Sequence, residues 1–287
     1  MDDPSDFTGS RVAILGLGLM GGSLALALRG QVRELRAADP DPAVIELAGR
    51  LGIVERLSAD PADVLPGTDI VILAAPVQAI LELIAQLPHI HPGSAVVLDL
   101  GSTKTQICQA MEALPDRFDP VGGHPMCGKE TAGLGCAEVE LFRGATFALS
   151  ALGRTSGRGR QAAEQIARAT GAVPLWIDPE AHDRQVAATS HVPYLLANAL
   201  AMATPLEAAR LVGPGFRSTS RLAASFAPMM LDVLASNRQN VLKALGRFRA
   251  ELDIIEHTLA QNDRAALGEA LSRSAERHGE LVFGGEH

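Results

Sequence analysis

The side chains with the clearest chemical potential in this sequence are histidines, a serine and arginines in four short segments. The segments are Asp99-Leu-Gly-Ser102-Thr-Lys104, Gly122-Gly-His124-Pro-Met-Cys-Gly-Lys129-Glu130, Thr189-Ser190-His191-Val-Pro193 and Gly215-Phe-Arg217-Ser-Thr-Ser-Arg221. A histidine that titrates near neutrality can accept the proton of a hydroxyl group during its oxidation, and general-base catalysis contributes about 10²–10⁴-fold. We therefore expect His124 to be the catalytic base, with a hydrogen-bonded turn residue as the structural alternative.

Ser102 and two lysines accompany this histidine. Ser102 can donate a hydrogen bond to the substrate hydroxyl or orient His124, and it can also cap a helix that begins near Lys104. The 25 basic residues include only three lysines, which are Lys104, Lys129 and Lys243. Two of the three lie in the segments above, so they are candidates for the site, although each could equally be a solvated charge.

A glycine-rich segment near the start of the chain predicts a dinucleotide site. Gly16-Leu-Gly18-Leu-Met-Gly21 follows an apolar run and opens a helical pattern, which is the context of the Gly-x-Gly-x-x-Gly fingerprint. Gly16 permits a tight turn, Gly18 lets the backbone approach a pyrophosphate at the helix N-terminus, and Gly21 lets helix and strand pack closely. The residues expected to bind the cofactor include this fingerprint and the end of the strand at 70–74: Gly16, Gly18, Leu19, Met20, Gly21, Ala75 and Pro76.

Asp39 is the predicted contact for the adenosine ribose. It ends the second expected strand, eighteen residues after Gly21, where a carboxylate can accept hydrogen bonds from the ribose hydroxyls. Asp41 is nearby and no arginine immediately follows Asp39, so a 2′-phosphate would be repelled. We expect NAD rather than NADP, with a helix cap or turn as the alternative role of Asp39.

The order of the expected elements predicts the fold class. Short apolar runs alternate with helical patterns in the first part, as in a doubly wound α/β domain. Expected strands lie at 11–15, 35–38, 70–74, 95–99, 119–122, 145–151 and 173–177, and expected helices at 22–29, 42–51 and 104–113. The basic segment 154–160 is expected to be a solvated loop rather than a binding patch. After Asp178-Pro179 helical periodicity dominates. The sequence thus predicts a Rossmann-type dinucleotide-binding domain (1–178) followed by an all-helical substrate and dimerisation domain (179–287).

Composition limits the partners and the location. Hydrophobic residues make up 47% of the chain and charged residues 20%, which is typical of a globular protein. The formal charge of −8 argues against nucleic acid or an anionic membrane as partner. The three cysteines have neither CxxC nor zinc-ligand spacing, so we expect no metal site and a cytoplasmic location. The acidic N-terminus lacks the pattern of a signal peptide, and the uncharged stretch 12–28 is too glycine-rich for a membrane span.

In their order behind the glycine fingerprint, the four segments resemble the prephenate/arogenate dehydrogenases of tyrosine biosynthesis. The resemblance covers about residues 11–259, and its most specific parts are His-Pro-Met-x-Gly from His124 and Ser-His-x-Pro from Ser190. It implies an NAD-dependent oxidoreductase that acts on prephenate or arogenate. In this reaction a ring hydroxyl is oxidised, and carbon dioxide leaves as the ring becomes aromatic.

The resemblance also implies cationic residues for the substrate, which carries two carboxylates or a carboxylate and an amino acid side chain. Arg221 is the candidate for a bidentate carboxylate clamp, and Arg217, one helical turn earlier on the same face, would support it. His191 is expected in the first helix of the second domain, reaching back toward the cleft. Its alternative is a core histidine beside a proline kink.

Several positions depart from the common sequence pattern of the family, namely Cys127, Lys129, Ser218 and Met230. They are expected around the substrate rather than the cofactor, so they leave the identity of the substrate's side chain open. A cation at Lys129 would favour the pyruvyl group of prephenate over the ammonium group of arogenate, and Lys129 is therefore a candidate for substrate binding.

Two other functions fit the sequence less well. A 3-hydroxyacid dehydrogenase of similar architecture typically uses a lysine in a glycine-rich helical motif, whereas here the second domain has only Lys243 and no such glycine run. A non-catalytic NAD-sensing protein would not need Ser102, His124, His191 and Arg221 together. The Ala- and Leu-rich stretches 194–202 and 241–259 exceed what one small layer can bury, so we expect a homodimer.

Overall fold

The structure, a computed structural model, describes residues 7–284 of the chain. The acidic N-terminus, for which we expect no signal peptide, lies outside the described residues. The chain divides into two compact units, Met1–Arg238 and Gln239–His287.

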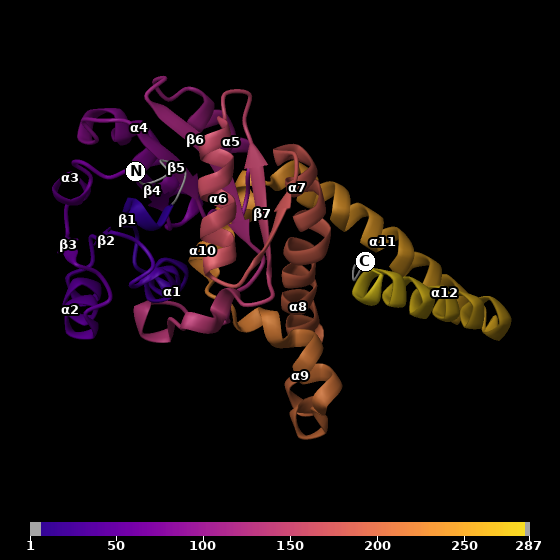
Figure 1. The fold of residues 1–287 in the computed structure, drawn as a ribbon. Coiled ribbons are helices and arrows are strands. Elements are labelled where there is room, and N and C mark those ends of the chain that lie inside the picture. The colour runs from indigo at the N-terminus through magenta and orange to yellow at the C-terminus, as the bar shows by residue number, and fades with distance from the viewer. Residues whose placement is uncertain (1–6, 285–287) are drawn as a thin grey trace. The chain divides into compact units, whose positions relative to one another are not determined.

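The first unit contains an eight-stranded sheet in the order β3-β2-β1-β4-β5-β6-β7-β8 (Figure 1). Neighbouring strands are parallel except β6 and β7, which are antiparallel. The strands are β1 (Arg11–Leu15), β2 (Glu34–Ala38), β3 (Arg56–Ser58), β4 (Ile70–Leu73), β5 (Ala95–Asp99), β6 (Phe118–Pro125), β7 (Thr146–Ala151) and β8 (Val173–Trp176). This order confirms the predicted Rossmann-type sheet, whose ligands bind at the carboxyl ends of the strands.

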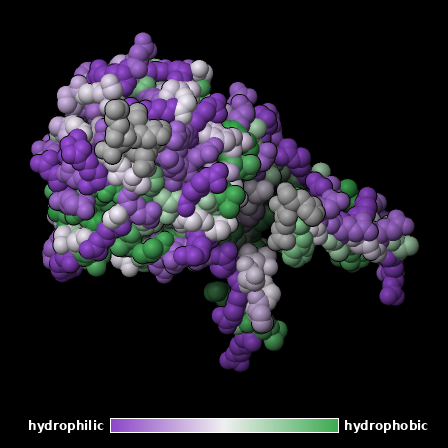
Figure 2. Space-filling model, in the orientation of Figure 1, coloured by the Kyte–Doolittle hydropathy of each residue, from purple (hydrophilic) through white to green (hydrophobic). Residues whose placement is uncertain are grey.

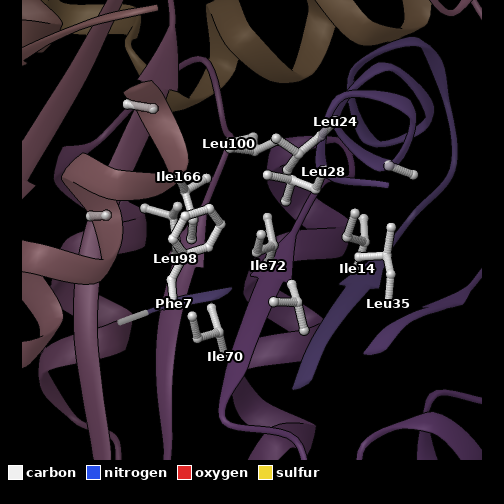
Figure 3. Close-up of a cluster of buried hydrophobic side chains, with 14 of the residues drawn as sticks. Phe7, Ile14, Leu24, Leu28, Leu35, Ile70, Ile72, Leu98, Leu100 and Ile166 are labelled. Atoms are coloured by element: carbon white, nitrogen blue, oxygen red, sulfur yellow. The ribbon is translucent and has the colours of Figure 1, made fainter. Parts of the chain in front are cut away.

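Helices cover both faces of the sheet because the central strands are apolar on both sides. They are α1 (Leu19–Leu28), α2 (Pro42–Leu51), α3 (Pro61–Val64), α4 (Val77–Ile90), α5 (Thr105–Glu112) and α6 (Gly157–Ala169). Along β1, Ile14 joins a core with side chains of α1 and α6, while Leu15 joins a core with side chains of α4 and α5. Figure 3 shows the first of these cores, in which side chains of β1, β2, β4 and β5 meet Leu24, Leu28 and Ile166.

The sequence-based boundaries were wrong in three places that matter for the site. Helix α1 begins at Leu19 rather than at 22, so the last glycine of the fingerprint lies inside it. Strand β6 extends through Pro125, so His124 lies within a strand and not after it, because β7 pairs antiparallel with residues 121–125. Strand β3 and helices α3 and α4 were not predicted.

The basic segment 154–160 is only partly a loop. Helix α6 begins at Gly157, where Ser156 caps it by accepting a hydrogen bond from the backbone of Gly159. The guanidinium group of Arg154 donates to main-chain carbonyl oxygens, including that of Phe118 at 2.7 Å. This arginine therefore stabilises the fold, and the segment is not a free cationic patch.

The remainder of the first unit is helical, as predicted. It contains α7 (Pro179–Val186), a π-helix (Ala187–His191), α8 (Val192–Ala203), α9 (Pro214–Ser220) and α10 (Ala227–Ser236), with short 3₁₀-helices at Leu206–Leu211 and Arg221–Ala224. Earlier 3₁₀-helices lie at Phe7–Gly9, Leu134–Cys136 and Val139–Phe142. The π-helix continues directly into α8, whose second residue is Pro193. A proline cannot donate the usual helical hydrogen bond, and π-turns are frequent at functional sites.

The second unit consists of the long helices α11 (Arg238–Ala260), which begins at the last residue of the first unit, and α12 (Arg264–Phe283). Figure 2 shows hydrophobic residues among the hydrophilic ones along this pair. The large exposed apolar side chains here are Leu242, Phe248, Leu252, Ile254, Leu259, Leu271, Leu281, Val282 and Phe283. Across residues 7–284, no helix combines the length and the apolarity that crossing a membrane would require.

Candidate active site

A cavity of about 290 Å³ lies at the carboxyl ends of β1, β4, β5 and β6. It is lined by residues 18–20, 74–77, 100–102, 124–125, 127–133, 226, 229 and 233. The predicted residues Gly18, Leu19, Met20, Ala75, Pro76, Ser102, His124 and Lys129 are therefore brought together around one space. His191, Arg217 and Arg221 are not among the residues that line it.

A second cavity of about 510 Å³ adjoins the first, since both are lined by Gly18 and residues 74–76. Gly16 and Asp39 line only this second space. Its charged lining residues are Asp39 and Glu82, and no lysine or arginine lines it. Its charge is thus negative.

The three glycines of the fingerprint have different structural roles. Gly16 adopts φ +99°, and an added Cβ would lie 2.4 Å from the carbonyl oxygen of Ala74. A Cβ on Gly21 would lie 1.9 Å from the carbonyl oxygen of Gly16, so that glycine permits the contact between α1 and the loop. At Gly18 an added Cβ would meet no protein atom within 4 Å, because it points into open space. Of the three glycines, Gly18 is thus the one whose missing side chain is not required by packing within the protein.

Asp39 holds the glycine-rich loop in place. Its Oδ2 accepts a hydrogen bond from the backbone N–H of Leu17 at 2.7 Å, and its Oδ1 accepts one from the N–H of Asp41 at 3.0 Å. The cap of α2 is Asp41, whose side chain accepts from Ala43. The alternative role of Asp39 as the helix cap is therefore wrong, while it does act as a turn residue.

His124 is the histidine that lines the first cavity, and it takes part in a chain of hydrogen bonds. Its Nδ1 lies 2.9 Å from Nε2 of His182, and Nδ1 of His182 lies 2.9 Å from Oδ1 of Asp183. Burial lowers the pKa of His124 well below its usual value, and the electrostatic effects of His182, Lys104 and His191 lower it further, while Asp183 opposes this shift. At neutral pH its imidazole is therefore uncharged and able to accept a proton.

His182 and Asp183 were not singled out from the sequence. Both lie on α7 and are buried, with 2% and 1% of their surfaces exposed. The carboxylate of Asp183 also accepts from the backbone N–H groups of Lys104 at 2.7 Å and Thr105 at 2.9 Å. It thereby satisfies the N-terminus of α5, so the alternative in which Ser102 caps that helix is wrong.

Lys104 is fully buried, so the alternative of a solvated charge is wrong for this residue. Its ammonium group contacts the carboxylate of Asp99 and donates to the carbonyl oxygen of Gly123 at 2.6 Å. Asp99 also accepts from the backbone N–H groups of Gly101 at 2.8 Å and Gly123 at 3.0 Å. Burial raises the pKa of Asp99, whereas Lys104 and these N–H groups lower it. The buried pair joins the ends of β5 and β6 beneath His124.

His191 is buried in the π-helix, behind the cavity rather than in its wall. The side-chain amide of Asn237 lies 3.3 Å from Nδ1 of His191 and donates to the main-chain oxygen of Asp183 at 2.7 Å. Since the second contact fixes the amide as a donor, Nε2 of neutral His191 carries the ring proton. Burial lowers the pKa of His191 to about 4. His191 can therefore offer an N–H group, but no charge, at neutral pH.

The two arginines do not share one regular helix. Arg217 lies on α9, while Arg221 begins the following 3₁₀-helix. Both are exposed, but only Arg221 is linked to the cavity, since its guanidinium group pairs with Glu130, which lines that space. Lys129 lines the same space, and its ammonium group pairs with Glu138 at 2.5 Å. Arg221 and Lys129 thus each have an acidic partner.

Among the described residues, no group of three or more histidine, cysteine, aspartate or glutamate side chains is arranged to hold a metal ion. Cys108, Cys127 and Cys136 are free thiols. Burial raises the pKa of Cys127, which lines the cavity, to about 11, so it is a thiol at neutral pH. The chemistry of this site therefore centres on His124.

A Rossmann-type sheet with a neutral histidine and a serine at its carboxyl edge defines a dinucleotide-dependent dehydrogenase. Residues 24–174 match the family model "Prephenate dehydrogenase, nucleotide-binding domain", and residues 178–273 match "Prephenate dehydrogenase, dimerization domain". Together the two matches cover most of the chain. The chain belongs to the prephenate dehydrogenase family, as its four segments predict.

Individual relatives agree with this assignment. The chain is 29% identical over 263 residues to prephenate dehydrogenase of Bacillus subtilis, covering 88% of this chain and 71% of the relative. The crystal structure of Aquifex aeolicus prephenate dehydrogenase in complex with hydroxyphenyl propionate and NAD⁺ has a TM-score of 0.86 at 28% identity, covering 95% of this chain and 98% of that one. Arogenate dehydrogenase of Synechocystis has a TM-score of 0.81 at 26% identity, covering 95% and 100%.

Proposed function

We propose that this protein catalyses the NAD-dependent oxidative decarboxylation of prephenate, or of arogenate, in tyrosine biosynthesis. The observation that carries the proposal is the uncharged imidazole of His124, which shares one cavity with Ser102 and with Gly18 of the dinucleotide fingerprint. The membership of the family and the names of its solved members support the same reaction.

The residues present fit a bound NAD. Gly18 leaves space where a pyrophosphate would approach the N-terminus of α1, and Ala75 and Pro76 join the two cavities. Asp39 would accept hydrogen bonds from the adenosine ribose, and the acidic lining of its cavity disfavours a 2′-phosphate. We therefore assign NAD rather than NADP as the cofactor.

The residues of the cavity account for the proton chemistry. When the ring hydroxyl is oxidised, Nε2 of His124 takes its proton, and Ser102 can donate a hydrogen bond to the same oxygen. Bound NAD supplies the acceptor for the hydride that leaves the carbinol carbon as its carbonyl bond forms. When carbon dioxide departs, the electron pair of the broken carbon–carbon bond stays in the ring, and His124 returns the proton to the ring oxygen. Atoms and charges then balance without net proton release.

The substrate's carboxylates are assigned to residues at the rim. Arg221 would clamp one carboxylate, which has to compete with Glu130 for the guanidinium group. Arg217 would supply a further cation near Arg221. His191 is buried and does not line the cavity, so its N–H group would reach the substrate only after a local rearrangement. Lys129 would favour the pyruvyl group of prephenate over the ammonium of arogenate, although Glu138 offsets part of its charge.

The experiment that tests the function is absorbance at 340 nm with purified protein, each substrate and each cofactor. NADH should form with NAD and prephenate or arogenate, and the kcat/KM values should favour prephenate. Failure of both substrates would refute the proposed reaction. Faster turnover with NADP would refute only the cofactor assignment, and a strong preference for arogenate only the role of Lys129.

Gly18→Ala is expected to weaken NAD binding without unfolding the protein. The backbone at Gly18 has φ −68°, which alanine adopts freely, and its Cβ would meet no protein atom. Because the methyl group would occupy the space of the pyrophosphate, the Kd for NAD should rise about tenfold or more, with an unchanged Tm. Gly49→Ala on α2, where a Cβ also meets nothing, is the matched control. Unaltered NAD binding in Gly18→Ala would contradict the site.

Arg221→Ala is expected to raise KM for the substrate by about 10–100-fold while kcat changes little. KM should rise because the substrate loses charge-assisted hydrogen bonds, each of which contributes about 1.5–3 kcal/mol to binding. The Kd for NAD should stay unchanged, and Arg210→Ala, an exposed arginine on the 3₁₀-helix Leu206–Leu211, is the control. An unchanged KM would show that another cation holds the carboxylate.

We further propose that residues 1–178 bind the cofactor and that residues 179–287 form the substrate and dimerisation domain. The match to a dimerization domain and the exposed apolar side chains of α11 and α12 support a homodimer. From the net charge of −8 we also propose that neither nucleic acid nor an anionic membrane is a partner.

A further inference from the structure

We propose that His182 and Asp183 are positioning residues that set the protonation state of His124, the base of the proposed function on which this inference rests. Their contacts form one line, from Asp183 through both nitrogens of His182 to Nδ1 of His124. The line ends at the cavity, where Nε2 is the remaining nitrogen of the His124 ring.

The donors and acceptors along this line follow from the chemistry of its fixed end. The Asp183 carboxylate is an acceptor, since the backbone N–H groups of Lys104 and Thr105 both donate to it. Nδ1 of His182 must therefore carry a proton, and in the uncharged form of this ring Nε2 is an acceptor. It follows that Nδ1 of His124 is the donor and that Nε2 of His124 keeps its lone pair. This is the tautomer that a base requires.

The fixed end is held by more than one element. Burial alone would raise the pKa of Asp183, but hydrogen bonds from His182, Thr105 and Lys104 outweigh that effect and lower it. Asn237, which follows α10, donates to the main-chain oxygen of Asp183 at 2.7 Å. The carboxylate is thus charged at neutral pH and cannot turn away without losing the cap of α5. The contacts that hold it all come from within the protein.

The same line also bears on the charge that His124 acquires. When His124 accepts the hydroxyl proton, the hydrogen bond from its Nδ1 to His182 strengthens, and Asp183 is the negative charge at the far end. Burial and the electrostatic effects of His182, Lys104 and His191 oppose protonation of this ring, whereas the charge of Asp183 favours it. Because the proton returns to the ring oxygen, His182 and Asp183 need only hold this charge and need not pass a proton to solvent.

The test compares Asp183→Asn, His182→Ala and His182→Gln with the unaltered protein. An amide NH2 group in the place of Oδ1 would donate to His182 and lose the hydrogen bond from the backbone of Lys104. It would reverse every donor along the line and leave a proton on Nε2 of His124. We expect kcat to fall by about 10²-fold or more in Asp183→Asn and His182→Ala, since the wrong tautomer removes the base. The KM for substrate and the Kd for NAD should change less than about threefold. Glu180→Gln, an exposed position on α7, is the control.

His182→Gln supplies a conservative replacement, because its side-chain oxygen can accept the proton of His124 Nδ1. It should recover part of the kcat that His182→Ala loses. Imidazole ¹⁵N chemical shifts, assigned with a His124→Asn sample, give a readout independent of activity. In the unaltered protein Nδ1 of His124 should be protonated and Nε2 not, and Asp183→Asn should reverse this pattern.

The outcomes separate this inference from the function beneath it. If the unaltered protein forms no NADH, the proposed function fails. A second outcome combines an active unaltered protein, an inactive His124→Asn variant, and His182 variants with normal kcat and normal Tm. In that case the proposed function stands and the positioning role is refuted. An unprotonated Nδ1 in His124 of the unaltered protein would also overturn it. Asp183→Asn alone could unfold α5, so the His182 variants decide.

Discussion

Replacement of His124 by asparagine should lower kcat by about 10²–10⁴-fold and leave the Kd for NAD unchanged. An asparagine amide can still donate to Nε2 of His182 from the position of Nδ1, so the local hydrogen bonding survives. It has no counterpart of Nε2, so the hydroxyl proton loses the acceptor that the imidazole provides. Steady-state kinetics at 340 nm with the proposed substrate measures the loss, and NAD titration measures cofactor binding.

The pH dependence gives a second measure of the same residue. Burial holds the pKa of His124 well below its usual value of 6.5, so the neutral, active form persists into mildly acidic solution. In the unaltered protein kcat/KM should stay level down to pH 6.5 and fall only below it, as protonation removes the base. This acid limb should be absent in His124→Asn. His89→Asn, at an exposed histidine of α4, is the matched control. Near-normal turnover in His124→Asn would refute the role of His124.

The parts of this site that could be predicted from the sequence are those encoded within short segments. In the fingerprint at Gly16–Gly21 and in the segment around His124, a few adjacent residues are enough to predict the function of the segment. The apolar composition of β1, β4 and β5 likewise predicts that these strands are buried. For such elements, local pattern and tertiary structure agree, so the Rossmann-type sheet could be derived without coordinates.

The parts that could not be predicted depend on contacts between distant segments. His182 lies 58 residues from His124, and only the packing of α7 against α5 and β6 brings the two rings together. The available signal was the adjacent pair His182-Asp183 at the first helix after the sheet. Similarly, the extension of β6 through His124 depends on its antiparallel partner β7, which is encoded more than twenty residues later.

The burial of Lys104 could not be predicted from the sequence either. The small number of lysines made this residue a candidate, but the residues next to it in the chain do not show that it is buried. Replacing it with methionine should destabilise the protein by about 3–5 kcal/mol, since Asp99 then remains as a buried, unpaired carboxylate. At about 2–4 °C per kcal/mol, the Tm should fall by about 6–20 °C. Thermal and urea unfolding measure this loss, and melting like that of the unaltered protein would contradict the buried pair.

The pH dependence of the variants distinguishes a lost ion pair from lost packing. Burial raises the pKa of Asp99, and the loss of Lys104 removes an effect that lowers it. In the folded variant Asp99 therefore binds a proton more readily than in the unaltered protein. The destabilisation of Lys104→Met should therefore shrink as the pH falls and grow as it rises. Asp99→Asn leaves the ammonium group of Lys104 buried without its ionic partner, so it should also destabilise the protein. In the double variant both charges are absent, so its destabilisation should be smaller than the sum of the two and independent of pH. If all three variants lose stability equally at every pH, Lys104 acts through the packing of its methylene chain and not through its charge.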